Sequence, residues 1–212
     1  MDANFWHNKW ANNEIAFHRS NANPLLVNNI KALALAEGSL IFIPLCGKTL
    51  DIAWLLSNGY RVAGVELVES AIKQLFAELG IPPKIAIKGK IKHYSGKDID
   101  IFVGDIFEVS QKILGPVNAI YDRAALVALP DEIRPRYTAH LMKITNQSPQ
   151  LLISYHYDQN LVQGPPFSIS NEEVGQHYKD NYDLTLIFST DVEGGMKGKC
   201  VAKENVWLLQ NN

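Results

Sequence analysis

The segment from residue 40 to residue 66 constrains the fold of this chain more than any other stretch of the sequence. It begins with an apolar run, turns at Pro44 and Gly47, and continues through a helix-length segment closed by Gly59. A second β-rich run follows and stops on Glu66. This order of patterns predicts a strand, a helix and a second, parallel strand packed as one βαβ unit.

The same segment carries the features of a nucleotide site. Gly47 allows a ligand to approach the backbone, and Glu66 follows nineteen residues later, where dinucleotide folds place an acid on the ribose hydroxyls. A full three-glycine turn is absent because Pro44 and Leu45 stand where small residues are expected, which disfavours a nicotinamide-dependent reductase. A phosphate loop would need glycine in place of Phe42. A ribose-bearing cofactor is the working hypothesis, and a turn shaped only by packing is the alternative.

Composition narrows the class of protein. A chain of 212 residues that is 47% apolar suits a single domain over 1–212 with a full core. The net charge is −2 and the charged residues are interspersed, so we expect no nucleic-acid or membrane partner. We expect a small-molecule substrate and a monomer. No leader pattern and no apolar run of about 18 residues is present, which predicts a cytoplasmic protein. Cys46 and Cys200 lack zinc-site spacing, so we expect no metal, and Cys46 is interpreted as a small core residue.

The N-terminal segment, residues 1–36, is rich in aromatic side chains. Trp6 and Trp10 are i,i+4 neighbours, and Phe17 falls seven residues later on the same helical face. This pattern predicts either a helix packed on the core or an apolar lid over a ligand, and the two are compatible. Asn23 followed by proline then predicts the start of a helix that precedes the sheet.

The rest of the chain repeats strands and helices. An inserted β-hairpin is expected over residues 84–100, ahead of a third strand that ends before Asp105. A fourth strand over Val117–Tyr121 should place Asp122 and Arg123 at its tip. Because ligands bind outside the carboxyl ends of strands in open α/β sheets, these residues and Glu66 are candidates for one site. The Asp122–Arg123 pair argues against a non-catalytic nucleotide-binding module. Further strands are expected at 151–155, 184–188 and 200–209.

Several longer motifs resemble those of the thiopurine S-methyltransferase family, in its bacterial form. They run in the expected order over nearly the whole chain and are W-x-x-x-W from Trp6, A-F-H at 16–18, P-L-C-G-K at 44–48, G-V-E-L at 64–67, D-R-A-A-L-V-A at 122–128 and G-P-P-F at 164–167. The resemblance implies a class I S-adenosylmethionine-dependent methyltransferase fold, which is Rossmann-like. Such a fold has a mostly parallel seven-stranded sheet, helices on both faces and an antiparallel final strand.

The resemblance also assigns roles to particular residues. It implies S-adenosyl-L-methionine as the cofactor and small, often aromatic, thiols such as thiopurines as methyl acceptors. The catalytic residue is then Arg123, and the substrate side is formed by Phe17, His18 and Phe167, with His18 a candidate base. The implied cofactor-binding residues are Trp10, Leu45, Gly47, Glu66, Asp105, Ile106 and Arg123. Related enzymes that methylate selenium or tellurium species, sulfide or halide would share the cofactor half, so these acceptors stay open.

Overall fold

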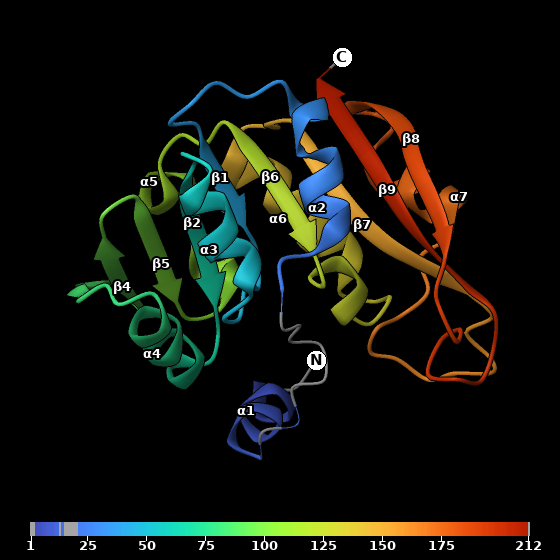
Figure 1. Ribbon diagram of the computed structural model, residues 1–212, viewed down its shortest axis with the longest axis horizontal. Helices are drawn as coiled ribbons and strands as arrows, with labels where there is room; N and C mark the ends of the chain where they lie inside the picture. Colours follow the sequence, from blue (N-terminus) through green and yellow to red (C-terminus); the bar gives the residue numbers. More distant parts are fainter. Residues whose placement is uncertain (1–2, 13, 15–20, 212) are drawn as a thin grey trace.

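The computed structural model describes residues 3–12, 14 and 21–211, and its centre is a nine-stranded sheet (Figure 1). The strand order is β3-β4-β5-β2-β1-β6-β7-β9-β8. The strands are β1 (Leu40–Ile43), β2 (Arg61–Glu66), β3 (Lys84–Lys88), β4 (Ile91–Gly96), β5 (Ile99–Val103), β6 (Ala119–Arg123), β7 (Gln150–Tyr157), β8 (Tyr182–Asp191) and β9 (Ala202–Asn211).

Helices cover both faces of this sheet (Figure 1). One face packs with α2 (Pro24–Asn29), α3 (Leu50–Ser57) and α4 (Glu69–Glu78), and the other with α5 (Gln111–Leu114), α6 (Arg134–Thr145) and α7 (Asn171–Tyr178). The remaining helix, α1 (Ala3–Ala11), lies beyond the carboxyl ends of the central strands. Short 3-10 turns, η1 (Ile30–Leu33), η2 (Ile106–Glu108) and η3 (Leu126–Ala128), follow α2, β5 and β6. No helix of the described residues is long and apolar enough to cross a membrane.

The central strands confirm the predicted fold class. β2, β1, β5, β6 and β7 pair in parallel, whereas β9 is antiparallel to both of its neighbours, β7 and β8. Seven strands in the order β5-β2-β1-β6-β7-β9-β8 form the expected sheet. The strand number differs because β3 and β4 join its edge through antiparallel pairing of β4 with β5.

Close packing explains the glycine in β2. A Cβ atom on Gly64 would lie only 2.8 Å from the Cys46 sulfur and 2.8 Å from a methyl carbon of Ile101. The turn after β1 therefore rests directly on β2, and its backbone is held there by the Cys46 N–H donating to the Val65 carbonyl at 2.8 Å. The two strands that carry the proposed nucleotide site are thus locked together at their carboxyl ends.

One strand differs from the sequence prediction in a way that matters for the site. The expected strand over 117–121 lies at Ala119–Arg123, so Asp122 and Arg123 belong to the strand and do not follow it. Successive side chains of a strand point to opposite faces, so these two neighbours cannot both face one site. The prediction that they act as a pair at the sheet edge is therefore wrong.

Candidate active site

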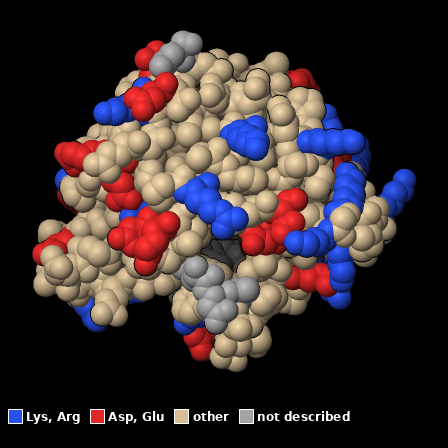
Figure 2. All heavy atoms as spheres, turned by 180° about the vertical axis from the view of Figure 1, so that it is seen from behind, with Lys and Arg blue, Asp and Glu red and all other residues tan. Residues whose placement is uncertain are grey.

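A cavity of about 840 Å³ lies at the carboxyl ends of the parallel strands. Its walls come from α1, from the segments after β1, β2, β5, β6 and β7, and from Lys197 between β8 and β9. Seen from behind, this end of the molecule is hollowed, and both basic and acidic side chains border the hollow (Figure 2). Such a cavity is within the range of about 300–1,000 Å³ typical of small-molecule sites.

Glu66, the last residue of β2, is a buried acid with both carboxylate oxygens fixed. Its Oε2 accepts the Gly47 N–H at 2.8 Å, and its Oε1 accepts the Val68 N–H at 2.8 Å. Burial raises the pKa of this carboxyl, and the backbone hydrogen bonds act against that rise. Each carboxylate oxygen has a second lone pair, so Glu66 can accept two further hydroxyl groups from a ligand.

The turn after β1 holds two residues in the left-handed region of backbone space. Leu45 has φ 48° and Gly47 has φ 53°. This conformation costs a non-glycine residue roughly 1–2 kcal/mol, and such strain persists where the surroundings enforce it. Between them, Cys46 is buried, and burial raises the pKa of its thiol well above the usual value, which fits a core residue.

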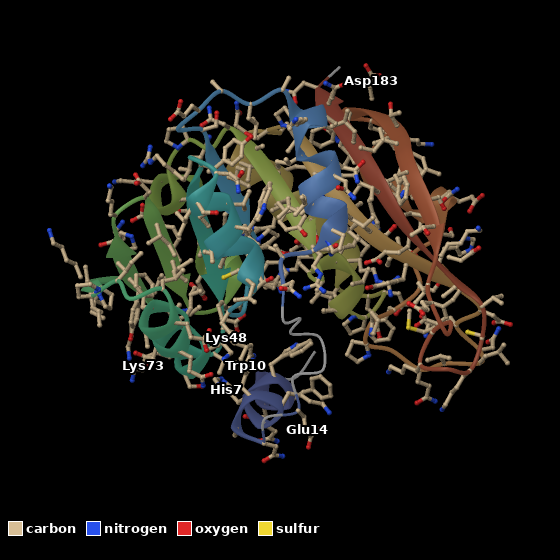
Figure 3. All side chains as sticks on the ribbon, in the orientation of Figure 1. His7, Trp10, Glu14, Lys48, Lys73 and Asp183 are labelled. Carbon is tan, nitrogen blue, oxygen red and sulfur yellow. The ribbon has the colours of Figure 1, made fainter. Side chains whose placement is uncertain are left out.

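Helix α1 brings Trp10 onto this turn. A Cβ atom on Gly47 would lie 3.1 Å from the indole ring, and Trp10 is buried against Val68 and Ala71. Figure 3 shows Trp10 extending from α1 toward the end of the sheet, with Lys48 nearby. The mostly buried ammonium of Lys48 is paired with Glu78 at 2.6 Å. The aromatic face of α1 therefore closes one end of the cavity.

Asp105 and Ile106 line the cavity where β5 ends. The Asp105 side chain accepts the Phe107 N–H at 2.9 Å, which begins η2 and leaves its second oxygen available to a ligand. Ile106 is buried, and its carbonyl oxygen lies 2.9 Å from the His140 ring nitrogen on α6. The apolar side chain of Ile106 and the carboxylate of Asp105 are thus neighbours. A heterocyclic ring could pack on the first while its amino group donates to the second.

Arg123 lines the cavity from the end of β6, and Asp122 does not. Arg123 is half-buried and forms no ion pair among the described residues. The following residue, Ala124, has φ 61°, a second strained position on the cavity wall. Asp122 instead points to the opposite face of the sheet, where it accepts the Tyr137 hydroxyl at 2.7 Å and the Leu126 N–H at 3.1 Å. Burial raises the pKa of Asp122 to about 6.

The loop after β7 reaches the cavity through Gly164, Pro165 and Pro166, whereas Phe167 is not among the lining residues. The Phe167 N–H donates to the Val127 carbonyl at 2.6 Å, and the Phe167 ring lies 5.4 Å from the Arg134 guanidinium. Phe167 therefore ties the loop to η3 and faces away from the cavity. Two other predicted residues, Phe17 and His18, lie outside the described residues.

Several lining residues were not predicted from the sequence. The hydroxyl of Tyr121 donates to the buried carboxylate of Asp51 at 3.0 Å, and both residues line the cavity. Asp51 lies in the first turn of α3, the helix that follows the turn at Pro44 and Gly47. Its place could therefore have been predicted from the βαβ pattern of residues 40–66. Tyr155, Arg136 and Lys197 also line the cavity, and no local sequence pattern marks them.

Comparisons with solved structures define the class of fold. The N1-methyltransferase from Burkholderia thailandensis, solved with 1,6-didemethyltoxoflavin and S-adenosylhomocysteine, superimposes with a TM-score of 0.66. It is 13% identical, and the match covers 99% of this chain and 87% of that one. The fold is therefore that of the S-adenosylmethionine-dependent methyltransferases.

Sequence comparisons then give the family. The family model of thiopurine S-methyltransferase (TPMT) matches residues 1–212. Proteins named thiopurine S-methyltransferase from Xanthobacter autotrophicus and Teredinibacter turnerae are both 48% identical, with the matches covering 99% and 100% of this chain and 99% of each relative. The chain belongs to the thiopurine S-methyltransferase family, and it is an S-adenosylmethionine-dependent methyltransferase.

Proposed function

We propose that this enzyme methylates the sulfur of small aromatic or heterocyclic thiols, such as thiopurines, by direct in-line transfer. The observation that carries the proposal is the position of Arg123. Arg123 ends β6, which lies in the sheet between β2 and β5, whose carboxyl ends carry Glu66 and Asp105, and β7, whose following loop forms an apolar wall with the segment after β6. A half-buried cation without an acidic partner among the described residues favours an anionic reactant such as a thiolate.

The residues of the acidic half fit S-adenosylmethionine. Glu66 has free lone pairs for both ribose hydroxyls, and the left-handed turn at Leu45 and Gly47 leaves backbone open toward the methionine part. Asp105 can accept from the adenine amino group while Ile106 packs on the ring. S-adenosylmethionine, when bound, supplies an electrophilic methyl group on a positively charged sulfur.

The protein contributes placement and electrostatics to the reaction. Trp10 covers the turn and excludes water, and its indole face favours a nearby positive charge. Arg123 lowers the pKa of a bound thiol and orients the thiolate. Proximity and orientation of the two reactants then carry most of the rate. The apolar wall, formed by Val127, Pro165 and Pro166, suits a flat aromatic acceptor.

We further propose that the chain is a single methyltransferase domain whose N-terminal part, residues 1–36, consists of an aromatic lid followed by the helix α2, which packs on the sheet. The contact of Trp10 with Gly47, and of α1 with the start of α4, supports a closed position over the cofactor half. Phe17 and His18, which lie outside the described residues, remain proposed substrate-side residues. Phe167 is proposed to act by holding the loop that contributes Pro165 and Pro166.

Two measurements on the purified protein test this function. Calorimetric titration should give binding of S-adenosylhomocysteine and no binding of NADH. A screen for S-adenosylhomocysteine release should then give faster turnover with thiophenol and 6-mercaptopurine than with selenite, tellurite, sulfide or iodide. Binding of NADH alone would overturn the cofactor assignment, and turnover confined to the inorganic acceptors would overturn the thiol assignment.

A further inference from the structure

Lys197 places a positive charge at the end of the cavity far from the ribose carboxylate. Its Nζ donates to the carbonyl oxygens of Gln163 at 3.2 Å and Pro165 at 3.0 Å, in the loop after β7. Glu66 ends β2, which is three strand positions from β7. At about 4.8 Å per strand, the axes of these two strands are roughly 14 Å apart across the sheet.

The turn between β8 and β9 fixes this lysine. Met196 is buried in a small cluster with Tyr157 and Val162, and its N–H donates to the Cys200 carbonyl at 2.8 Å. Lys197 itself has φ 51°, the left-handed conformation that a lysine rarely adopts. The Lys197 side chain is exposed, and its two hydrogen bonds to the loop carbonyls place the ammonium at the cavity rim.

The loop that receives Lys197 is also tied down. The Tyr157 hydroxyl donates to the Pro166 carbonyl at 2.6 Å, and Gln159 accepts the Ser168 N–H at 2.8 Å while donating to the Val162 carbonyl at 2.6 Å. The residues that flank the two carbonyl groups bound to the ammonium are therefore tied to the end of β7 and to Gln159. A rigid support of this kind preorganises a binding group.

Among the described residues, the charge of Lys197 has no acidic partner. No carboxylate of the described residues forms an ion pair with it, and the acids that line the cavity have other partners. Glu66 accepts two backbone N–H groups, Asp51 accepts from Tyr121, and Asp105 accepts from Phe107. Glu14, the remaining acid of the lining, pairs with Lys9.

Glu204 on β9, the strand next to β7, is the remaining acid that could be considered as a partner of Lys197, and it does not line the cavity. Its side chain accepts the Tyr155 hydroxyl at 3.0 Å, and Tyr155 stands in the cavity wall. An ammonium has three donor hydrogens, and two of those on Lys197 go to the loop carbonyls. One donor remains for a ligand.

From this geometry we infer that Lys197 binds an anionic substituent of the methyl acceptor, so that the enzyme prefers thiols carrying a carboxylate. This inference rests on the proposed thiol methylation. Arg123 ends β6 and faces the reacting sulfur, whereas Lys197 is bound to the loop after the neighbouring strand, β7. A flat acceptor on the apolar wall would then direct its sulfur to Arg123 and its carboxylate to Lys197.

The test compares two acceptors that differ in charge but hardly in shape, 4-mercaptobenzoate and 4-mercaptobenzamide. The quantity is the ratio of their kcat/KM values, from S-adenosylhomocysteine release. In Lys197→Gln, which keeps a donor for the loop carbonyls but loses the charge, the ratio should fall about tenfold. Lys197→Arg should retain the wild-type preference. The control is Lys199→Gln, which removes an exposed charge that does not line the cavity and should leave the ratio unchanged.

A second readout is independent of turnover. The S-methyl product of 4-mercaptobenzoate, titrated into each protein in the presence of S-adenosylhomocysteine, should bind about tenfold more weakly to Lys197→Gln than to the wild type. If Lys197→Gln lowers kcat/KM equally for both acceptors, the lysine only holds the loop and the inference is wrong. If the wild-type enzyme methylates neither thiol, the proposed function itself fails. If it methylates both thiols equally well, the proposed function stands and only the inference about Lys197 is wrong.

Discussion

Replacing Glu66 with glutamine removes the charge of the carboxylate that we propose binds the ribose, while nearly keeping its shape. Glutamine has one oxygen, so its amide nitrogen must face the N–H of either Gly47 or Val68, both of which donate to the native carboxylate at 2.8 Å. One backbone donor then loses its partner, and one ribose hydroxyl loses a charged acceptor. Hydrogen bonds to charged groups are worth about 1.5–3 kcal/mol, so the dissociation constant of S-adenosylhomocysteine should rise roughly 10- to 150-fold.

The effect on folding should be smaller than the effect on binding. An unsatisfied buried donor costs about 1–3 kcal/mol. Because burial already raises the pKa of Glu66, the charged form is not favoured by the folded state, and its removal offsets part of this cost. We expect a loss of about 1 kcal/mol in the free energy of unfolding, which is a fall of about 2–4 °C in the melting temperature of a domain of this size.

The assay is calorimetric titration of the wild type and the variant with S-adenosylhomocysteine, accompanied by thermal unfolding. Glu69→Gln is the matched control, since it removes a carboxylate three residues further along that binds Lys92 and Tyr94 and does not line the cavity. The control should bind S-adenosylhomocysteine like the wild type. An affinity of Glu66→Gln within twofold of the wild type would refute the assignment of the ribose to this carboxylate.

Three further predictions concern other parts of the site. Arg123→Ala should lose thiol methylation about 100-fold and weaken S-adenosylhomocysteine binding; unchanged turnover of thiophenol would count against its role. Trp10→Ala should weaken S-adenosylhomocysteine binding severalfold by opening the cavity to water, and equal affinities in titration would contradict a lid. The pKa of Asp122 is about 6 in the folded state and 3.8 in the unfolded chain. Between pH 3.8 and 6, the folded state therefore keeps a proton on Asp122 that the unfolded chain has lost. The free energy of unfolding should therefore fall by about 3 kcal/mol as pH rises through that window, and urea unfolding of Asp122→Asn should lack this component.

The sequence predicted that Gly47 and Glu66 come together, because the segment that joins them is local. A strand, a turn, a helix and a strand lie within residues 40–66, and each leaves a pattern of apolar spacing or a glycine. The parallel pairing of β1 with β2 brings Gly47 to Glu66, nineteen residues apart. The full fold class was implied by the family resemblance of the longer motifs. The two additional strands were anticipated only as a hairpin, since nothing in their sequence indicates pairing with the edge of the sheet.

The acceptor half depends on contacts between distant segments, and there the sequence was less informative. A shift of two residues in the bounds of β6 was enough to assign Asp122 to the cavity, when it is buried on the other face against Tyr137. Phe167 was expected to meet the substrate and instead packs beside Arg134. Lys197 reaches the site from a turn between two edge strands, and only the three-dimensional arrangement reveals its bonds to the loop after β7.

The identity of the methylated product tests the central claim most directly. The enzyme would be incubated with thiophenol and S-adenosylmethionine carrying a trideuterated methyl group, and the products would be analysed by mass spectrometry. We predict trideuterated methyl phenyl sulfide and S-adenosylhomocysteine in equal amounts, with formation of both about 100-fold slower in Arg123→Ala. Release of S-adenosylhomocysteine without the labelled sulfide, or no release with any thiol, would contradict the assignment of this cavity to thiol methylation.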